Sequence, residues 1–347
     1  MPSSYLGYPF DPELFLLNWQ AAQDPTLTAM FDSGAVQANG VLRSLIANGS
    51  DVYTLPFYNV LGGTPDNYDG DADITVTTPD GASQSGIVFG RAHAWKDQDF
   101  VHDFNSGADP MRQITSQVAK YWQKQRQSIM LKILNGVFSI EDDSTDAWDE
   151  WQNHTYNIAM AAAGTVAESN KLGATTAGDA IQKAVGDNAG IFGLAWMHSK
   201  VANGLAGLQL LNYRKYTDPQ GIERQLSIAD FNGLTVIVDD GCPATVNSTS
   251  KATEYTTYLM GTGALQYAPA PVKVPVETGR EQLTDGGYNF YVTRIRETLH
   301  PNGFTFTAPS TSYKHSPTDA QLGDKANWKL CGVTPKAIPM ARIISNG

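Results

Sequence analysis

Aspartates cluster in two stretches of the sequence where they could bind a cation or act as an acid–base pair. The first stretch, DNYDGDAD, places four aspartates between residues 66 and 73. A calcium loop needs an oxygen ligand at its first position and a glutamate at its twelfth, and alignment on Gly70 places Pro65 and Val76 there. We interpret the stretch as a solvated hairpin tip, with a weak cation site as the alternative.

The second stretch is the pair Asp239 and Asp240, which directly follows the strand-like sequence GLTVIV. Carboxylates at the ends of strands form active sites in many α/β sheets. No His or Lys is close to this pair in the sequence, and Gly241 and Pro243 favour a turn. We therefore interpret the pair as a polar strand exit, with a carboxylate site as the alternative.

Motifs of the common catalytic and nucleotide-binding sites are absent. The chain has no G-x-x-x-x-G-K-[ST], no H-E-x-x-H and no G-x-S-x-G. Gly261-Thr262-Gly263 lacks the third glycine of a dinucleotide fingerprint and predicts a turn, and Trp148 and Trp151 are interpreted as packing residues. The histidines have no i, i+4 pair, which favours packing over metal binding: His93, His102, His154, His198, His300 and His315. We predict no catalytic residue, no metal site and no cofactor.

One basic stretch stands out in a chain whose net charge is -11. Residues 109 to 138 contain five Lys or Arg and, after Asp109, no Asp or Glu. A rotation of 100° per residue places four of the cations on one helix face and Lys132 nearer the opposite face. These four cations are Arg112, Lys120, Lys124 and Arg126.

The element that positions these cations is predicted to be one long helix. Asp109 is a good N-cap, Pro110 suits the first helical position, and Gly136 suits a left-handed residue at the helix end. At about 1.5 Å per residue the helix would be roughly 40 Å long. Its apolar residues recur at three- and four-residue steps: Met111, Ile114, Val118, Tyr121, Trp122, Ile129, Ile133 and Val137. One face is therefore predicted to pack and the other to be basic.

Length and composition indicate a globular protein with a mixed, loop-rich fold. The chain has 347 residues, of which 41% are hydrophobic, with 32 Gly and 18 Pro. A pI near 4.9 argues against nucleic-acid binding along the whole chain, so any contact with a polyanion must be local. Two cysteines exclude a disulfide framework. We see neither a secretory signal nor a membrane span.

Elements along the chain are predicted from local patterns. Residues 1 to 49 combine short helical pieces with turns and cannot form a core of their own. Alternation at 74 to 77 and 87 to 89 around Pro79-Asp80-Gly81 predicts a hairpin. Helices and strands alternate farther on, which predicts a mixed sheet flanked by helices. The predicted helices are 176 to 187 and 199 to 211, and the predicted strands are 191 to 198, 233 to 241 and 253 to 268.

Several segments, in this order, resemble the major capsid proteins of tailed bacteriophages, which share the HK97-type shell fold. The order of the segments covers nearly the whole chain and is specific, although no single segment is decisive. The segments are SGAVQANGVLRSLIANGSDVYTLPFYNVLGG (33 to 63), RAHAWKDQDFVHDFNSGADPMRQITSQVAKYWQKQRQSIMLKILNGVF (91 to 138), AWMHSKVANGLAGLQLLNY (195 to 213), FNGLTVIVDDGCP (231 to 243), YTTYLMGTGAL (255 to 265), VPVETGRE (274 to 281), LHPNGFTF (299 to 306) and ANWKLCGVTPKAI (326 to 338).

The resemblance implies an α+β fold of the HK97-like capsid type. Its parts would be an N-terminal arm (1 to 49), an extended β-hairpin loop reaching over a neighbouring subunit (50 to 95), and a peripheral domain (96 to 170) with a spine helix (109 to 135). An axial domain (171 to 275), with a mixed sheet flanked by helices, and a return to the peripheral domain (276 to 347) would follow. Arm and loop would then find their partners on other subunits.

The resemblance also implies a structural protein and not an enzyme. It would self-assemble as pentamers and hexamers into the icosahedral head of the virion, after assembly in the host cytoplasm. Expected partners are many copies of itself, a portal protein, a scaffolding protein, decoration proteins and double-stranded DNA bound non-specifically, with no membrane. An encapsulin-type nanocompartment shell is the alternative of the same fold, and a carbohydrate-active enzyme or lectin is the more distant one.

Three details follow from the resemblance. The spine helix lies near the inner surface of such shells, so Arg112, Lys120, Lys124 and Arg126 would face packaged DNA without sequence readout. Pairing with acidic residues of neighbouring segments, for example 141 to 150, is the alternative. Residues 51 to 95 contain no Lys, so we predict no isopeptide crosslink from this loop. We see no long charged helical segment before the arm, which predicts a separate scaffolding protein.

Overall fold

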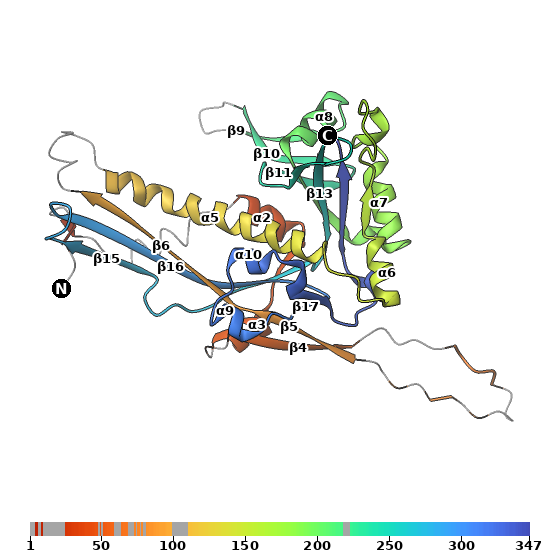
Figure 1. Cartoon of the computed structure of the whole chain (residues 1–347), viewed down its shortest axis with the longest axis horizontal. Coiled ribbons are helices and arrows are strands. Elements are labelled where there is room, and N and C mark those ends of the chain that lie inside the picture. Colours follow the sequence, from red (N-terminus) through yellow and green to blue (C-terminus); the bar gives the residue numbers. More distant parts are fainter. Residues whose placement is uncertain are drawn as a thin grey trace.

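The structure is a computed structural model in which the described residues are 4–5, 8–9, 25–47, 49, 51–58, 64–68, 73, 75–76, 78, 81–98, 110–217 and 223–347. These parts are α+β, with an eight-stranded sheet, a five-stranded sheet and three two-stranded sheets. The longest helix, α5 (Pro110–Val137), extends along the long axis of the molecule (Figure 1).

The helix α5 begins at the predicted Pro110, whereas Asp109 lies outside the described residues. Gly136 does not end the helix, which continues to Val137, and its φ is not positive. A Cβ on Gly136 would lie 3.1 Å from backbone atoms of Leu322 and Gly323. The prediction that Gly136 is a left-handed terminal residue is therefore wrong, because a glycine is needed there for close approach of two segments.

The five-stranded sheet is built around one long strand, β16 (Tyr288–Pro301). On one side β16 pairs antiparallel with β6 (Phe89–Gln98), and on the other with β15 (Val276–Glu281) and β14 (Leu265–Pro269). A short strand, β3 (Val36–Ala38), pairs parallel with β14. The N-terminal half of α5 packs on this sheet (Figure 1), where Trp122 donates a 3.0 Å hydrogen bond from Nε1 to Thr293 Oγ1.

The eight-stranded sheet confirms the predicted mixed sheet flanked by helices. Strands β8 (Phe192–Met197) and β11 (Leu234–Val238) are parallel, and α7 (Thr176–Val185) and α8 (Ser199–Gly207) pack on the sheet. The strand order is β7 (Thr155–Asn157), β19 (Met340–Ser345), β13 (Thr253–Gly261), β8, β11, β10 (Glu223–Phe231) and β9 (Asn212–Thr217), with β12 (Ala244–Val246) also paired to β13.

The strand predicted at 253 to 268 is two strands in different sheets. The chain leaves the eight-stranded sheet at the end of β13 and enters the five-stranded sheet at β14. Between them is the turn predicted at 261 to 263, in which Gly263 has a φ of 76°. A Cβ on Gly261 would lie only 2.7 Å from Ile191 O. Both glycines are needed for this passage, because one has a left-handed φ and the other a close contact.

One buried cluster joins the two large sheets through the C-terminal half of α5. Ile129, Ile133, Leu134 and Val137 of α5 contact side chains from both sheets. These side chains include Leu194, Trp196, Tyr258 and Met260 of the eight-stranded sheet, and Leu265 and Leu299 of the five-stranded sheet. Each fully buried side chain of this size contributes about 1.5 to 3 kcal/mol, so this cluster is the main source of stability.

A two-stranded ribbon, β4 (Val52–Tyr58) with β5 (Gly81–Ile87), leaves the body and continues into the projecting loop (Figure 1). Val52 is paired with Ile87 and Tyr58 with Gly81. The predicted tight hairpin around 79 to 81 is therefore wrong, and Thr75 and Val76 are not in a strand. Pairing is decided by Tyr53 and Leu55, which are buried against distant parts of the chain that local alternation cannot show.

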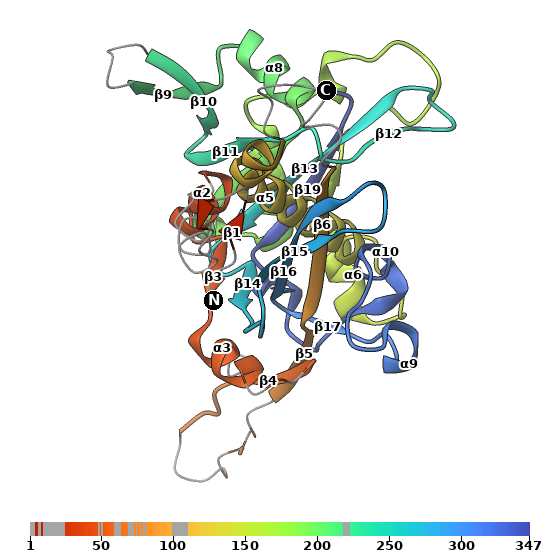
Figure 2. The ribbon, with the colours of Figure 1, turned by 90° about the vertical axis from the view of Figure 1, so that its left-hand side faces the viewer.

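The remaining elements surround these parts. The helix α3 (Gly40–Ala47) lies near β4, at the opposite end of the molecule from α8 (Figure 2). The other elements are β1 (Ser4–Tyr5), β2 (Tyr8–Pro9), α2 (Pro25–Asp32), α6 (Asp146–Gln152), β17 (Phe304–Phe306), α9 (Ser310–Tyr313), α10 (Asp319–Leu322) and β18 (Trp328–Leu330).

Candidate functional site

The basic residues of α5 are divided between different environments. Lys120 and Lys124 are exposed on the N-terminal half of the helix. Arg126 is largely buried, with its side chain 15% exposed, and Lys132 is exposed near the C-terminal half. Arg112 belongs to α5, but its side chain lies outside the described residues. The predicted face of four cations is thus reduced to two described lysines.

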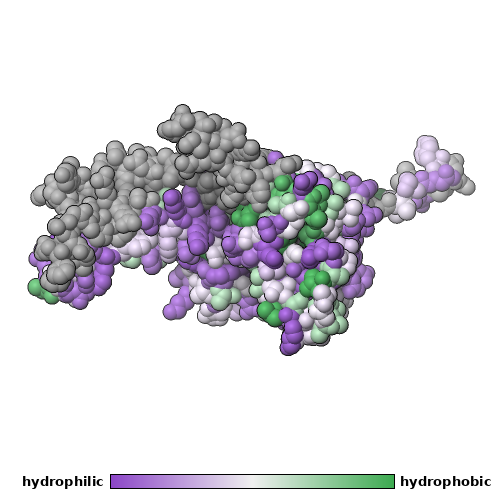
Figure 3. All heavy atoms as spheres, turned by 90° about the horizontal axis from the view of Figure 1, so that it is seen from above, coloured by the Kyte–Doolittle hydropathy of each residue, from purple (hydrophilic) through white to green (hydrophobic). Residues whose placement is uncertain are grey.

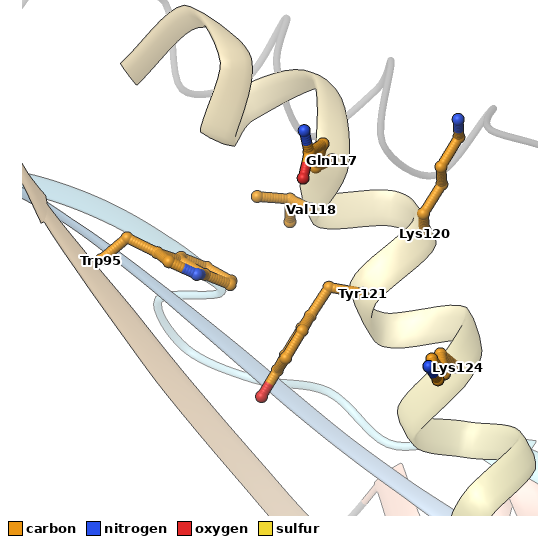
Figure 4. A pocket seen from close by; sticks show the side chains of 6 residues that line it. All are labelled: Trp95, Gln117, Val118, Lys120, Tyr121 and Lys124. Carbon is orange, nitrogen blue, oxygen red and sulfur yellow. The ribbon is translucent and has the colours of Figure 1, made fainter. Parts of the chain in front are cut away.

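Lys120 and Lys124 border a cavity of about 510 Å³ between α5 and β6. Its other lining residues are Trp95, Gln117, Val118 and Tyr121. Trp95 of β6 and Tyr121 of α5 lie next to each other beside the cavity, whereas Lys120 points away from the strands (Figure 4). The Trp95 and Tyr121 rings lie 5.3 Å apart, edge to face, and His93 stacks on Tyr121 at 5.1 Å.

This arrangement combines two ammonium groups with an aromatic wall. Within the described part of the chain, neither Lys120 nor Lys124 forms an ion pair. Such a surface can attract an anionic group and provide apolar contact beside it. The sequence interpretation missed the aromatic wall, although alternation in RAHAW places His93 and Trp95 on one face of a strand, which is the signal that could have found it.

Arg126 does not share the exposed basic face. Its Nε donates to Glu297 Oε2 at 3.0 Å, and the Glu297 side chain is only 3% exposed. The Tyr267 hydroxyl donates to the same carboxylate at 3.2 Å, and the Arg126 guanidinium lies over the Tyr267 ring at 5.7 Å. The prediction that Arg126 faces away from the packed side is therefore wrong, because a buried carboxylate of β16 holds the guanidinium.

Lys132 joins a second ion-pair group that connects three elements. Asp319, the first residue of α10, accepts hydrogen bonds from Lys132 Nζ at 2.9 Å and from Arg91 at 2.6 Å. Partial burial would raise the pKa of the Asp319 carboxyl, but the hydrogen bonds from Lys132 and Arg91 outweigh it and lower that pKa. The group fixes α10 to α5 and β6, and it leaves no free cation at Lys132.

One carboxylate of the acidic loop is hydrogen-bonded to a residue of the same loop. Asp66 accepts hydrogen bonds from the backbone N–H and the hydroxyl of Thr75. Asp73 is exposed, and Asp69 and Asp71 lie outside the described residues. No group of three or more His, Cys, Asp or Glu side chains suited to a metal ion occurs among the described residues.

Asp239 and Asp240, at the end of β11, form separate hydrogen bonds, as expected for a polar strand exit. Asp239 accepts from the Gly241 backbone N–H at 2.8 Å, which forms a local turn. Hydrogen bonds from Ser199 at the start of α8 lower the pKa of Asp240. His198 lies 3.8 Å from Asp240, a proximity that arises because β8 and β11 are parallel neighbours. The two carboxylates bond in different directions and do not converge on one point.

Histidine and tryptophan side chains mostly pack, as predicted. Trp151 is 1% exposed and stacks on Phe138 at 5.1 Å, so it offers no sugar-binding platform. His154 Nδ1 lies 2.6 Å from Met340 O, and burial lowers the pKa of this histidine. His300 is 1% exposed. His102 lies outside the described residues.

Apolar side chains on the surface are scattered. The most exposed are Leu283, Tyr68, Val76, Val246 and Val41, of which Tyr68 and Val76 share the projecting loop and the others lie elsewhere. Figure 3 shows the described part of the projecting loop standing well away from the body. Among the described residues, none of the helices has both the length and the apolar character required to cross a bilayer.

Comparison with solved structures identifies the fold. The capsid of Ralstonia phage GP4 matches with a TM-score of 0.51 and 11% identity, over 79% of this chain and 86% of that chain. A chain of Mycobacterium phage Bobi matches with a TM-score of 0.50 and 12% identity, over 92% and 90%. The fold is that of an HK97-type shell protein, as the sequence predicted.

The sequence comparison then gives the family. The major capsid protein of Bacillus phage SPP1 is 30% identical over 306 residues, which cover 87% of this chain and 86% of that protein. No family model matches the chain. The chain belongs to the family of bacteriophage major capsid proteins, and it is a structural protein of the capsid shell that assembles with copies of itself.

Proposed function

We propose that this chain is the major capsid protein of a phage whose head is an icosahedral shell of pentamers and hexamers enclosing double-stranded DNA. The observation that carries the proposal is the 30% identity to the SPP1 protein over most of both chains. The form of the molecule supports it, because a long loop projects from the body and the described residues at its tip are exposed (Figure 1). Such a loop gains stability only by burial against another subunit.

The division into parts is also a proposal. We assign residues 1 to 49 to the arm, 50 to 95 to the extended loop, 96 to 170 and 276 to 347 to the peripheral domain, and 171 to 275 to the axial domain. The eight-stranded sheet supports this division in part, because β8 to β13 lie within 171 to 275. The two sheets also cross its boundaries, since β7 and β19 belong to the eight-stranded sheet and β14 to the five-stranded sheet. Closed symmetry would then let many modest contacts between copies add up to a strong shell.

Electron microscopy of particles purified from producing cells tests the proposal. We expect closed shells of uniform diameter, and heads containing DNA when the phage's packaging proteins are present. Small oligomers alone under all conditions would contradict it. Shells that enclose a protein cargo and no genome would support the encapsulin-type alternative instead.

Assembly is proposed to occur in the host cytoplasm with a portal protein, a separate scaffolding protein and decoration proteins. Correctly sized shells from this chain alone would contradict the need for a scaffold. We also propose that no isopeptide crosslink forms from the loop, because residues 51 to 95 contain no Lys. A ladder of covalent multimers on a denaturing gel of boiled particles would contradict this.

A structural role without catalysis is proposed because the relative is a structural protein. The described residues also offer little support for the carbohydrate-active alternative. Trp151 is buried, and the carboxylates of Asp239 and Asp240 accept hydrogen bonds from Gly241 and Ser199 respectively. Size-exclusion chromatography discriminates between the two, since a sugar-active enzyme would be a monomer or small oligomer.

Contact with packaged DNA is proposed for the basic residues of α5 that remain available, Lys120 and Lys124, together with Arg112. Arg126 is excluded from this role by its buried pairing with Glu297. Such contacts would neutralise phosphates without reading sequence. Acidic side chains of another copy are the alternative partners for the same two lysines.

The test uses Lys120→Gln with Lys124→Gln, and exposed lysines elsewhere, Lys251→Gln with Lys273→Gln, as the control pair. If the α5 lysines contact DNA, filled heads of the first variant should lose DNA at lower stress than the control, with a weaker dependence on salt. If assembly fails before packaging, the acidic-partner alternative is favoured. Normal DNA retention in the α5 variant across salt concentrations would contradict the DNA role.

A further inference from the structure

The projecting loop is held only at its base among the described residues. At its far end Tyr68 is 91% exposed and Val76 is 88% exposed. The side chains of Tyr53 and Gln84, near the body, are each 4% exposed. Pro56 and Ser83, the next pair of the ribbon beyond Leu55 and Gln84, are exposed. The direction of the loop in a free subunit therefore depends on the few residues where the ribbon meets the body.

A relay of two hydroxyl groups ties both strands of the ribbon to β16. The Thr298 hydroxyl donates to Ile87 O at 2.9 Å and lies 2.8 Å from the Tyr53 hydroxyl. A threonine hydroxyl has one proton, so Tyr53 must donate to Thr298 while Thr298 donates to Ile87. Thr298 is 0% exposed, so water does not replace these bonds. One side chain of the body thus holds β4 and β5 together.

The backbone connection between the ribbon and the body is short. Val88 alone separates β5 from β6, and its N–H donates to Asp51 O at 2.8 Å. The Tyr53 ring lies directly against Gly86, where a Cβ would be 2.3 Å from the ring. Figure 1 shows β5 and β6 as nearly one continuous run from the loop to the far end of the five-stranded sheet. The ribbon therefore cannot turn without disturbing that sheet.

Charged side chains add a second attachment at the base of the ribbon. The Asp51 carboxylate accepts from Arg296 at 2.7 Å and lies 2.9 Å from His315 Nδ1. Arg296 belongs to β16, the same strand that carries Thr298. In addition, Gln84 Oε1 accepts from the Gly303 backbone N–H at 3.1 Å. One strand of the body, β16, and two turns, at Gly303 and His315, thus hold a ribbon of two strands.

We infer that these contacts fix the direction of the loop in the free subunit, so that Tyr53, Thr298 and Asp51 are positioning residues for shell assembly. The reason is that a small rotation at the base of the ribbon produces a large displacement farther out. The seven residues of β4 span about 23 Å, so a 10° rotation at the base moves the outer end of the strand by about 4 Å, more than the reach of one hydrogen bond. The inference rests on the proposed function, in which the loop contacts another copy.

The first test measures loop direction in the unassembled full chain. Spin labels at Val76→Cys and Leu283→Cys, in a Cys331→Ser background, report the distance between the loop and the far end of the five-stranded sheet. Thr298→Val removes the relay at nearly constant shape and should broaden the distance distribution at least twofold. Thr54→Val is the matched control, since this exposed hydroxyl on the same ribbon bonds only Ser85. An unchanged distribution in Thr298→Val overturns the inference.

The second test measures assembly with the scaffolding protein of the same phage. Thr298→Val should give shells of mixed diameter and open sheets, whereas Thr298→Ser, which keeps the hydroxyl, should restore uniform shells. A variant that merely destabilises the fold would lower the yield and leave the diameter unchanged, and that result overturns the inference. If Thr298→Val does not fold, Tyr53→Phe takes its place in both tests. Failure of the unmodified chain to form shells would count against the proposed function, while the distance measurement would still decide the inference.

Discussion

The two halves of α5 both form regular helix, but their surroundings differ. The C-terminal half is enclosed by side chains from both large sheets, and Leu134 and Val137 are 0% exposed. The described side chains of the N-terminal half, from Gln117 on, pack on the five-stranded sheet, and Lys120 and Lys124 are exposed. The comparison indicates that one half stabilises the subunit, and that the other leaves exposed the two lysines for which we propose contacts outside it.

The largest expected effect is at the point where the two halves meet. Arg126→Met leaves the Glu297 carboxylate buried without its cation, which should cost about 3 to 5 kcal/mol of unfolding free energy. Urea denaturation of the unassembled chain measures the loss. Arg126→Met combined with Glu297→Met is the control, because removing both charges should recover most of the stability. A loss below about 1 kcal/mol in the single variant would show that the pair is solvated.

A cavity in the buried half should have the next largest effect. Leu134→Ala removes a side chain that is 0% exposed and contacts the central cluster, so the expected loss is about 3 kcal/mol, within the usual range of 2 to 5. Lys120→Ala in the exposed half is the matched comparison and should change the free energy by less than about 0.5 kcal/mol. Similar losses in the two variants would contradict the division of α5 into a buried and an exposed half.

Acid sensitivity should also arise in the buried region. Burial lowers the pKa of His300 to about 4, against a smaller opposite effect of a hydrogen bond with the Phe304 backbone. Between pH 6.5 and 4 the unfolded chain binds a proton at this histidine and the folded chain does not, so stability falls as the pH falls through this range. The loss from His300 is on the order of 3 kcal/mol at pH 4.

Unfolding free energy as a function of pH measures this loss. His300→Phe should flatten the curve between pH 6.5 and 4. Asp319 acts in a lower window, because its lowered pKa supports stability above pH 3.8 that is lost as the pH falls below it. A slope that is the same with and without His300 would contradict the assignment.

The sequence predicted α5 well because the signals that define a helix are local. Pro110 and the regularly spaced apolar residues belong to the helix itself, and the helix sequence contains no acidic residue. The environment of Arg126 was not predictable in this way, since its partner Glu297 is 171 residues away. Rotation about a helix axis shows which residues share a face, but not which strand covers that face.

Strand pairing likewise depends on residues that are far apart in the sequence. The alternation at 74 to 77 was read as one arm of a tight hairpin, yet β5 pairs with β4, because Tyr53 and Leu55 must be buried against α3 and Val88. The long strand expected at 253 to 268 was divided by a passage between sheets. The relay at Thr298 joins residues more than 200 positions apart, so no local pattern could indicate it. The order of segments resembling phage capsid proteins carried this long-range information instead.

The smallest expected effect on stability is at the exposed lysines, where the effect on function should be largest. Lys120→Gln with Lys124→Gln should leave the unfolding free energy within about 0.5 kcal/mol of the original, because neither side chain forms an ion pair within the described part of the chain. The same variant should alter either DNA retention or shell formation, according to which anion the lysines meet. Thermal unfolding of the subunit and electron microscopy of particles should therefore respond differently to this pair. If stability falls by 2 kcal/mol or more, the exposed half of α5 also supports the fold of the subunit, and the contrast between the two halves disappears.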